Sequence, residues 1–134
     1  MWFLCLSVTK KGDPLCRGGA IDVYKYKRFR SPGFPFQPKG MQIGSIVFAE
    51  GKRVYHAEDT DFILEMWRMR DIDVAFLPII GWTTIDLGEV VEAAIALYLK
   101  VGISMHSRDV DAEEFKDAVE IRSDVKVLVI PERD

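Results

Sequence analysis

The sequence predicts a single α/β domain on a mixed β-sheet, because strand patterns and helix patterns alternate along its C-terminal part. Two of the helices have clear start signals, and two of the strands are apolar on both faces. A chain of 134 residues can bury a hydrophobic core, and 49% apolar with 29% charged residues is a globular balance. The sequence shows no internal repeat that would divide the domain.

Five strands are predicted from runs of β-branched and other apolar residues that end at turn signals. They span residues 43–49, 53–57, 74–79, 101–105 and 125–130. Glu50 and Gly51 form a turn suited to a β-hairpin between the first two strands. Strands 74–79 and 125–130 are apolar nearly throughout, as is typical of strands covered on both faces. Because the helices can cover only one face and residues 1–30 are a thin candidate for the other, we expect a homodimer or a partner subunit to cover it.

The second of three predicted helices has the clearest pattern. Asp86 can act as its N-cap, and Glu89 completes a capping box. Apolar residues then recur at helical spacing and predict one buried face. These residues are Leu87, Val90, Val91, Ala94, Ile95 and Tyr98.

The other two helices are predicted on weaker signals. The first is expected over residues 62–69, with Thr60 or Asp61 as its cap. The third begins at an Asp111 cap with Glu114 in the box position. Its inward-facing residues are expected to be Phe115, Ala118 and Val119.

The N-terminal part, residues 1–30, is weakly patterned, and residues 28–40 predict a loop because they contain three prolines and two glycines. Residues 24–30 (YKYKRFR) mix aromatic and basic side chains. Such a run suits single-stranded nucleic acid, but alternation of this kind is also typical of a half-exposed strand. The net charge of −3 favours the strand and a protein with no nucleic-acid partner.

Cysteine content and hydropathy indicate the compartment. Cys5 and Cys16 are too few for a disulfide framework and form no metal-binding pair. No run approaches the roughly 20 apolar residues of a membrane span, and the N-terminus lacks the features of a secretory signal. We therefore expect a cytoplasmic protein with no membrane partner.

Asp59 and His106 are the candidate functional residues that follow from the strand pattern. Asp59 lies in the loop after strand 53–57, and His106 comes directly after strand 101–105. Open α/β sheets place ligands and catalytic groups beyond the carboxyl ends of their strands, so the two side chains could converge. The alternative is that the acidic loop only caps the following helix.

Several motifs in order resemble the metallo-β-lactamase superfamily, specifically its branch of metal-dependent hydrolases. The matching segments are residues 35–40 (PFQPKG), 51–61 (GKRVYHAEDTD), 71–78 (DIDVAFLP), 81–86 (GWTTID) and 104–106 (SMH). The resemblance covers residues 31–134 and is strongest to the C-terminal half of the family. It implies half of an αββα sandwich, with a mixed sheet and helices on one face. Residues 1–19 match no part of the family.

The resemblance implies metal ligands but an incomplete set. Asp59 corresponds to the bridging aspartate of a di-metal site, and His106 to its last histidine. The family's H-x-H-x-D-H motif is absent, since His56 and His106 are the only histidines. Gln37 replaces a family histidine and Glu58 replaces a glycine; with His56, they are auxiliary candidates.

A catalytic zinc usually takes three protein ligands and an open position, so Asp59 and His106 are too few. We therefore expect a degenerate, half-length relative of the hydrolases that is non-catalytic as an isolated chain and acts through assembly or binding. The alternative is a hydrolase completed by homodimerisation or by a separate N-terminal-half subunit, with zinc, manganese or iron as the metal. By family analogy, Trp82, Thr83 and Thr84 could line a pocket near Asp59.

Overall fold

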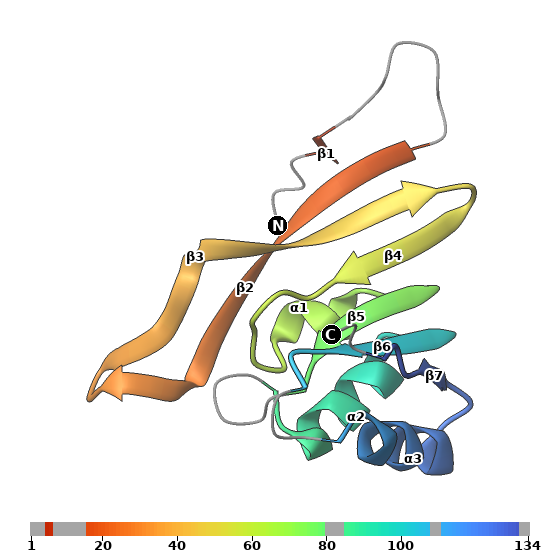
Figure 1. Ribbon diagram of the computed structural model, residues 1–134. Coiled ribbons are helices and arrows are strands. Elements are labelled where there is room, and N and C mark those ends of the chain that lie inside the picture. The colour runs from red at the N-terminus through yellow and green to blue at the C-terminus, as the bar shows by residue number, and fades with distance from the viewer. Residues whose placement is uncertain (1–4, 7–15, 80–84, 108–110, 132–134) are drawn as a thin grey trace.

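The computed structural model describes residues 5–6, 16–79, 85–107 and 111–131, which form a mixed sheet with helices (Figure 1). The strands are β1 (Cys5–Leu6), β2 (Cys16–Ser31), β3 (Phe34–Ala49), β4 (Lys52–His56), β5 (Val74–Pro78), β6 (Val101–Met105) and β7 (Lys126–Leu128). The helices are α1 (Leu64–Arg68), α2 (Leu87–Ala96) and α3 (Ala112–Arg122). None of these helices is long and apolar enough to cross a membrane.

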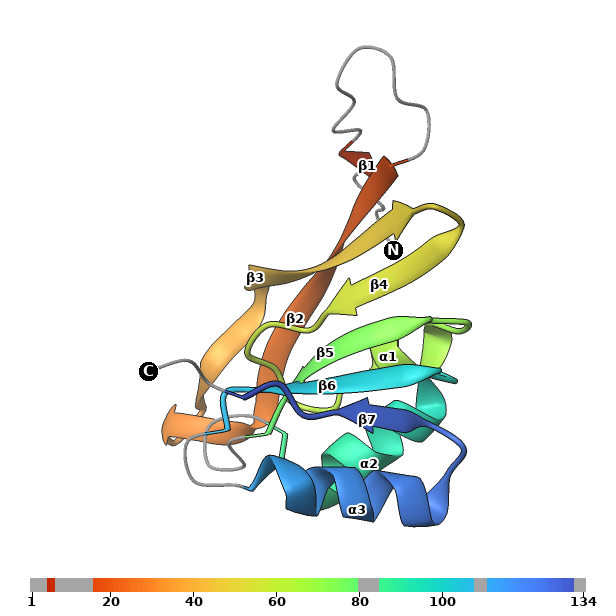
Figure 2. The same ribbon diagram turned by 45° about the vertical axis from the view of Figure 1, so that its right-hand side comes forward.

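The sheet is mixed, as the sequence predicts. Strands β1 to β4 pair in antiparallel fashion, whereas β4 to β7 are parallel neighbours, and the spatial order follows the chain order. Parallel neighbours need crossover connections, which here contain the helices. All the helices lie on the same side of the sheet (Figure 2). The predicted α/β class with helices on one face is confirmed.

The helix-covered side of the sheet contains the hydrophobic core. Residues in register on neighbouring strands project from the same face of a sheet. One such row is buried beneath the helices and consists of Ile46, Tyr55, Ala75, Gly102 and Val127. From the helices, Val90, Phe115 and Val119 pack against this row and are fully buried.

The opposite side, which we call the open face, carries none of the helices that the structure describes and is mostly apolar. Its side chains come from the two rows that flank the buried row. They include Val47, Val54, Val74, Val101, Phe76, Ile103 and Leu128. Val47 is 38% exposed and Leu128 is 54% exposed. The prediction that a second chain covers this face stays a prediction, but the apolar rows give it a defined surface.

The predicted loop over residues 28–40 is wrong, because this segment belongs to the long β2–β3 hairpin. Its turn lies between Ser31 and Phe34, with Gly33 at φ +80°. Proline lacks the N–H that a central strand must donate, but Pro35 and Pro38 precede the part of β3 that pairs with β4. The β2–β3 register also shifts in this region. The outer hairpin therefore tolerates prolines that a central strand would not.

The helix predictions are confirmed in part. The capping box of Asp86 and Glu89 is present, but α2 ends at Ala96, before Tyr98. Tyr98 has φ +51° and is 60% exposed, and Ile95 is 37% exposed, so neither faces the core as predicted. In α3, the Asp111 side chain accepts a hydrogen bond from the N–H of Glu113, and the inward positions of Phe115 and Val119 are confirmed.

The beginning of α1 corrects the predicted cap. The helix begins at Leu64 with Ile63 as its N-cap, and no side chain caps it. Thr60 and Asp61 instead bond to β2: the Thr60 hydroxyl donates to the carbonyl of Tyr24, and the Asp61 carboxylate accepts backbone N–H groups. The acidic loop therefore bonds to β2 and does not cap α1.

Asp73 connects the beginnings of three parallel strands and makes stability depend on pH. Its carboxylate accepts hydrogen bonds from the Lys100 ammonium and the backbone N–H of Arg53, which hold the pKa of Asp73 below its usual 3.8. A lowered pKa contributes stability that is present above pH 3.8 and is lost as the pH falls through the lowered value.

We therefore expect Asp73→Asn to lower the thermal unfolding midpoint at pH 7. The variant should also lose less stability than the parent chain between pH 5 and pH 2, because it no longer has this carboxylate to protonate. Thermal unfolding followed by circular dichroism measures both effects. Asp117→Asn, at an exposed position on α3, is the matched control. Parallel pH profiles for Asp73→Asn and the parent chain would contradict the prediction.

Candidate metal-binding site

The structure brings Asp59 and His106 together at the carboxyl end of the parallel strands. Asp59 follows β4 and His106 follows β6, and their nearest atoms, Asp59 Oδ1 and His106 Nε2, are 3.4 Å apart. Their side chains are 42% and 45% exposed, respectively. The predicted convergence of these two residues is confirmed, although 47 positions separate them in the sequence.

Asp59 Oδ1 is a buried atom that lacks a hydrogen-bond donor among the described residues. The contact with His106 has the distance of an ion pair but does not form a hydrogen bond. A buried carboxylate oxygen without a donor is costly, and such an atom in a native fold points to a water molecule, an ion or a partner group. Carboxylate oxygen and imidazole nitrogen are both ordinary ligands of zinc, manganese and iron.

The backbone beside this pair is strained. Glu58, directly before Asp59, has φ +55°, and His106 itself has φ +55°. Residues other than glycine rarely adopt this left-handed backbone conformation, and such strain is concentrated at functional sites. The value at Glu58 also explains the glycine that the resembling family has here, because glycine adopts positive φ without strain.

The auxiliary candidates lie in two different places. His56 projects from the open face, where its ring stacks on Phe76 at 5.7 Å, and its Nδ1 accepts a hydrogen bond from the N–H of Glu58. The Glu58 carboxylate is exposed and 3.6 Å from the same nitrogen. Gln37 is buried within the hairpin instead and contacts the backbone of Asp59. The site therefore borders the open face through His56 and Glu58.

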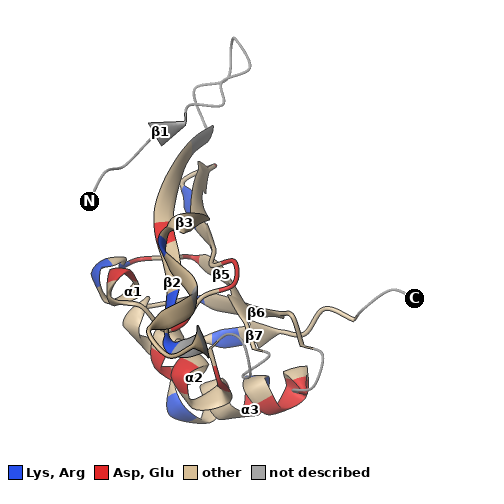
Figure 3. Ribbon diagram, turned by 90° about the vertical axis from the view of Figure 1, so that its left-hand side faces the viewer, with Lys and Arg blue, Asp and Glu red and all other residues tan. Residues whose placement is uncertain are grey.

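Side chains of the mixed aromatic and basic run of β2 bond to other parts of the same chain. The Tyr24 hydroxyl donates to the Glu65 carboxylate, and the Lys27 ammonium pairs with Glu89. Acidic residues gather on α2 and α3 (Figure 3), and Glu89 of α2 reaches this strand. Tyr24 and Lys27 therefore bond to acidic groups of the protein itself, as expected for a half-exposed strand.

The described residues contain no group of three or more histidine, cysteine, aspartate or glutamate side chains that could hold a metal ion. Asp59 and His106 thus form a pair of donors and not a complete catalytic site. The predicted pocket residues Trp82, Thr83 and Thr84 lie outside the described residues. The sequence did not reveal the contact of Gln37 with Asp59, because it depends on how the hairpin packs.

The fold is that of the metallo-β-lactamase group. A metallo-β-lactamase fold protein from Bacillus subtilis matches 87% of this chain and 48% of its own with a TM-score of 0.65, and at 5% identity this shows the fold alone. A Parabacteroides distasonis structure named as a metal-dependent hydrolase has a TM-score of 0.78 at 29% identity. The match covers 94% of this chain and 56% of the Parabacteroides chain.

The sequence relatives are more specific. A UPF0173 metal-dependent hydrolase from Staphylothermus marinus is 30% identical over 121 residues, which are 84% of this chain and 53% of that protein. No protein-family model matches the chain. The chain is a relative of the UPF0173 metal-dependent hydrolases with the metallo-β-lactamase fold, and it spans about half the length of the curated relatives that it matches.

Proposed function

We propose that this chain is one half of a metal-dependent hydrolase, in which Asp59 and His106 are metal ligands, and that it is non-catalytic alone. The observation that carries the proposal is the buried Asp59 Oδ1, which has no donor among the described residues and lies 3.4 Å from His106 Nε2. A metal ion between the two side chains would satisfy this oxygen. The relatives named as metal-dependent hydrolases support the same chemistry.

The remaining ligands come from a second αβ half. A catalytic zinc takes three protein ligands and leaves a position for water, so two donors need at least one more. When bound, such an ion acts as a Lewis acid and makes water a nucleophile at neutral pH. Asp59 and His106 would hold the ion. Glu58, the residue before Asp59, has an exposed carboxylate that would serve as an auxiliary ligand.

The second half packs on the open face in this proposal. The open face is mostly apolar along two rows of the sheet, which also contain Ser45, His56 and Lys126, and the site borders it through His56 and Glu58. A second copy would add another Asp59 and His106, whereas a separate αβ half would add different ligands. Both versions agree with a chain that spans about half of its relatives.

Zinc titration of the isolated chain tests the ligand assignment. The chain has two histidines, so a ¹⁵N-histidine NMR spectrum follows His56 and His106 separately. We expect zinc to shift the His106 ring nitrogens, and the double variant Asp59→Ala/His106→Ala to lower zinc affinity by at least roughly 100-fold. His56→Ala is the control, and we expect it to keep the parent's affinity. A parent chain whose His106 signals do not move at millimolar zinc would overturn the metal role.

If zinc leaves His106 unchanged, the chain acts through binding on the open face, which is the second candidate function. The observation that favours it is the extent of apolar surface there, including Leu128 at 54% exposure. In that case, the resemblance to hydrolases reflects ancestry.

A further inference from the structure

Gln37 occupies the position where the resembling family has a histidine, yet its contacts are those of a donor to the backbone. Only 5% of the residue is exposed, and it lies on β3 opposite Lys25 of β2. Its Nε2 donates to the carbonyl of Asp59 at 2.6 Å and to the carbonyl of Val23 at 3.2 Å. Both hydrogens of the amide group are therefore used, and the atom left to a metal is Oε1, a neutral oxygen that suits zinc less well than imidazole or thiolate.

These two bonds connect Asp59 to the hairpin. The next residues are held separately: the N–H of Asp61 donates to the Tyr24 carbonyl at 3.0 Å, and the N–H of Ile85 donates to the Thr60 carbonyl at 3.0 Å. Gln37 acts one residue earlier, on Asp59 itself. Glu58, on the other side of Asp59, has the strained φ of +55°. A buried donor at this carbonyl opposes relaxation of the strained backbone, which would move the Asp59 carboxylate.

We propose that Gln37 is a positioning residue, which fixes Asp59 opposite His106 by donating hydrogen bonds and does not itself bind the metal. The inference rests on the proposed function insofar as Asp59 is taken as a metal ligand. The hydrogen-bonding role of Gln37 can be tested without metal. Groups that orient metal ligands typically change metal affinity by about 10–100-fold when they are removed.

Two variants separate a positioning role from a ligand role. Gln37→Met keeps a long buried side chain and removes the donor, whereas Gln37→Glu replaces the donor with a carboxylate, which is the better zinc ligand. We expect both to weaken zinc binding at His106 by roughly 10-fold or more. Gln42→Glu adds the same charge at an exposed position of the same strand and should leave the affinity unchanged. Tighter zinc binding by Gln37→Glu, or unchanged binding by both variants, would overturn the inference.

The unmodified chain provides a measurement that needs no variant to fold. It has no asparagine and two glutamines, Gln37 and Gln42, so its NMR spectrum contains two side-chain amide pairs. We expect the Gln37 pair to exchange with solvent much more slowly than the Gln42 pair, in the absence of metal and in its presence. Equally fast exchange would overturn the bonds to Asp59 and Val23. If zinc leaves the His106 signals unchanged while the Gln37 amide is protected from solvent exchange, the metal proposal fails and the hydrogen-bonding role of Gln37 stands.

Discussion

Lysine placed on the open face will prevent the chain from self-associating. We expect the parent chain to form a dimer with twice the 15.3 kDa mass of one chain. Leu128→Lys, on β7, and Val47→Lys, on β3, each put a charge into the proposed interface. Burying an unpaired charge against apolar side chains is costly, so the dissociation constant should rise by roughly 100-fold or more. Light scattering after size-exclusion chromatography measures the mass.

The control for this prediction is Ile121→Lys. Ile121 lies on α3, on the helix side of the sheet, and is 83% exposed. It makes the same change from an apolar side chain to a charge, and we expect it to leave the dimer intact. A parent chain that is monomeric at micromolar concentration would contradict self-association and leave a separate αβ half as the cover of the open face.

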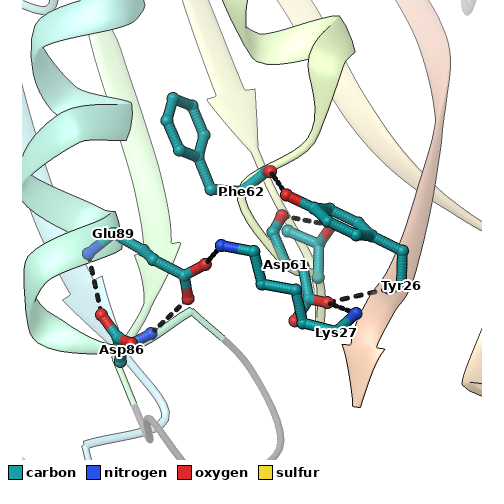
Figure 4. Close-up of polar contacts among 7 residues, drawn as sticks. Tyr26, Lys27, Asp61, Phe62, Asp86 and Glu89 are labelled. Carbon is teal, nitrogen blue, oxygen red and sulfur yellow. Dashed lines mark hydrogen bonds and ion pairs between the residues drawn. The ribbon is translucent and has the colours of Figure 1, made fainter. Parts of the chain in front are cut away.

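Replacing Asp61 with alanine will strongly destabilise the fold. The side chain is completely buried, and its Oδ2 accepts the backbone N–H groups of Tyr26 and Lys27, both at 2.8 Å (Figure 4). Alanine would leave these donors without their charged acceptor. We expect the free energy of unfolding to fall by roughly 2–4 kcal/mol, since a hydrogen bond to a charged group contributes about 1.5–3 kcal/mol. Urea unfolding followed by circular dichroism gives this value.

The same contact fastens the β2–β3 hairpin to the helix layer. Near Asp61, the Tyr26 hydroxyl donates to the carbonyl of Phe62, and the Lys27 ammonium pairs with Glu89 of α2 (Figure 4). Asp61→Ala should therefore also speed amide exchange in β2 more than in α3. Asp117→Ala, at an exposed site on α3, should change stability by less than about 0.5 kcal/mol. A similar result for Asp61→Ala would contradict its anchoring role.

Part of the candidate site follows from sequence pattern. Asp59 lies in the loop after one predicted strand and His106 comes directly after another, and parallel strands bring such positions to one edge of a sheet. The register then sets them 3.4 Å apart. The role of Gln37 does not follow in this way, because its partner carbonyls, on Asp59 and Val23, are distant in sequence. Only the packing of the hairpin brings them within reach of its amide.

The sequence by itself determined the elements whose causes are local. The α2 capping box of Asp86 and Glu89 lies within one turn, and the strand 101–105 ends where its apolar run ends. The tertiary structure decided that residues 28–40 form part of a β-hairpin, since prolines that predict a loop are tolerated in a hairpin arm away from β4. It also turned Asp61 from a predicted cap into the anchor of β2. The role of Asp61 depends on a partner more than 30 positions away, and the tolerance of the prolines depends on where their strand lies in the sheet. Local sequence pattern contains neither kind of information.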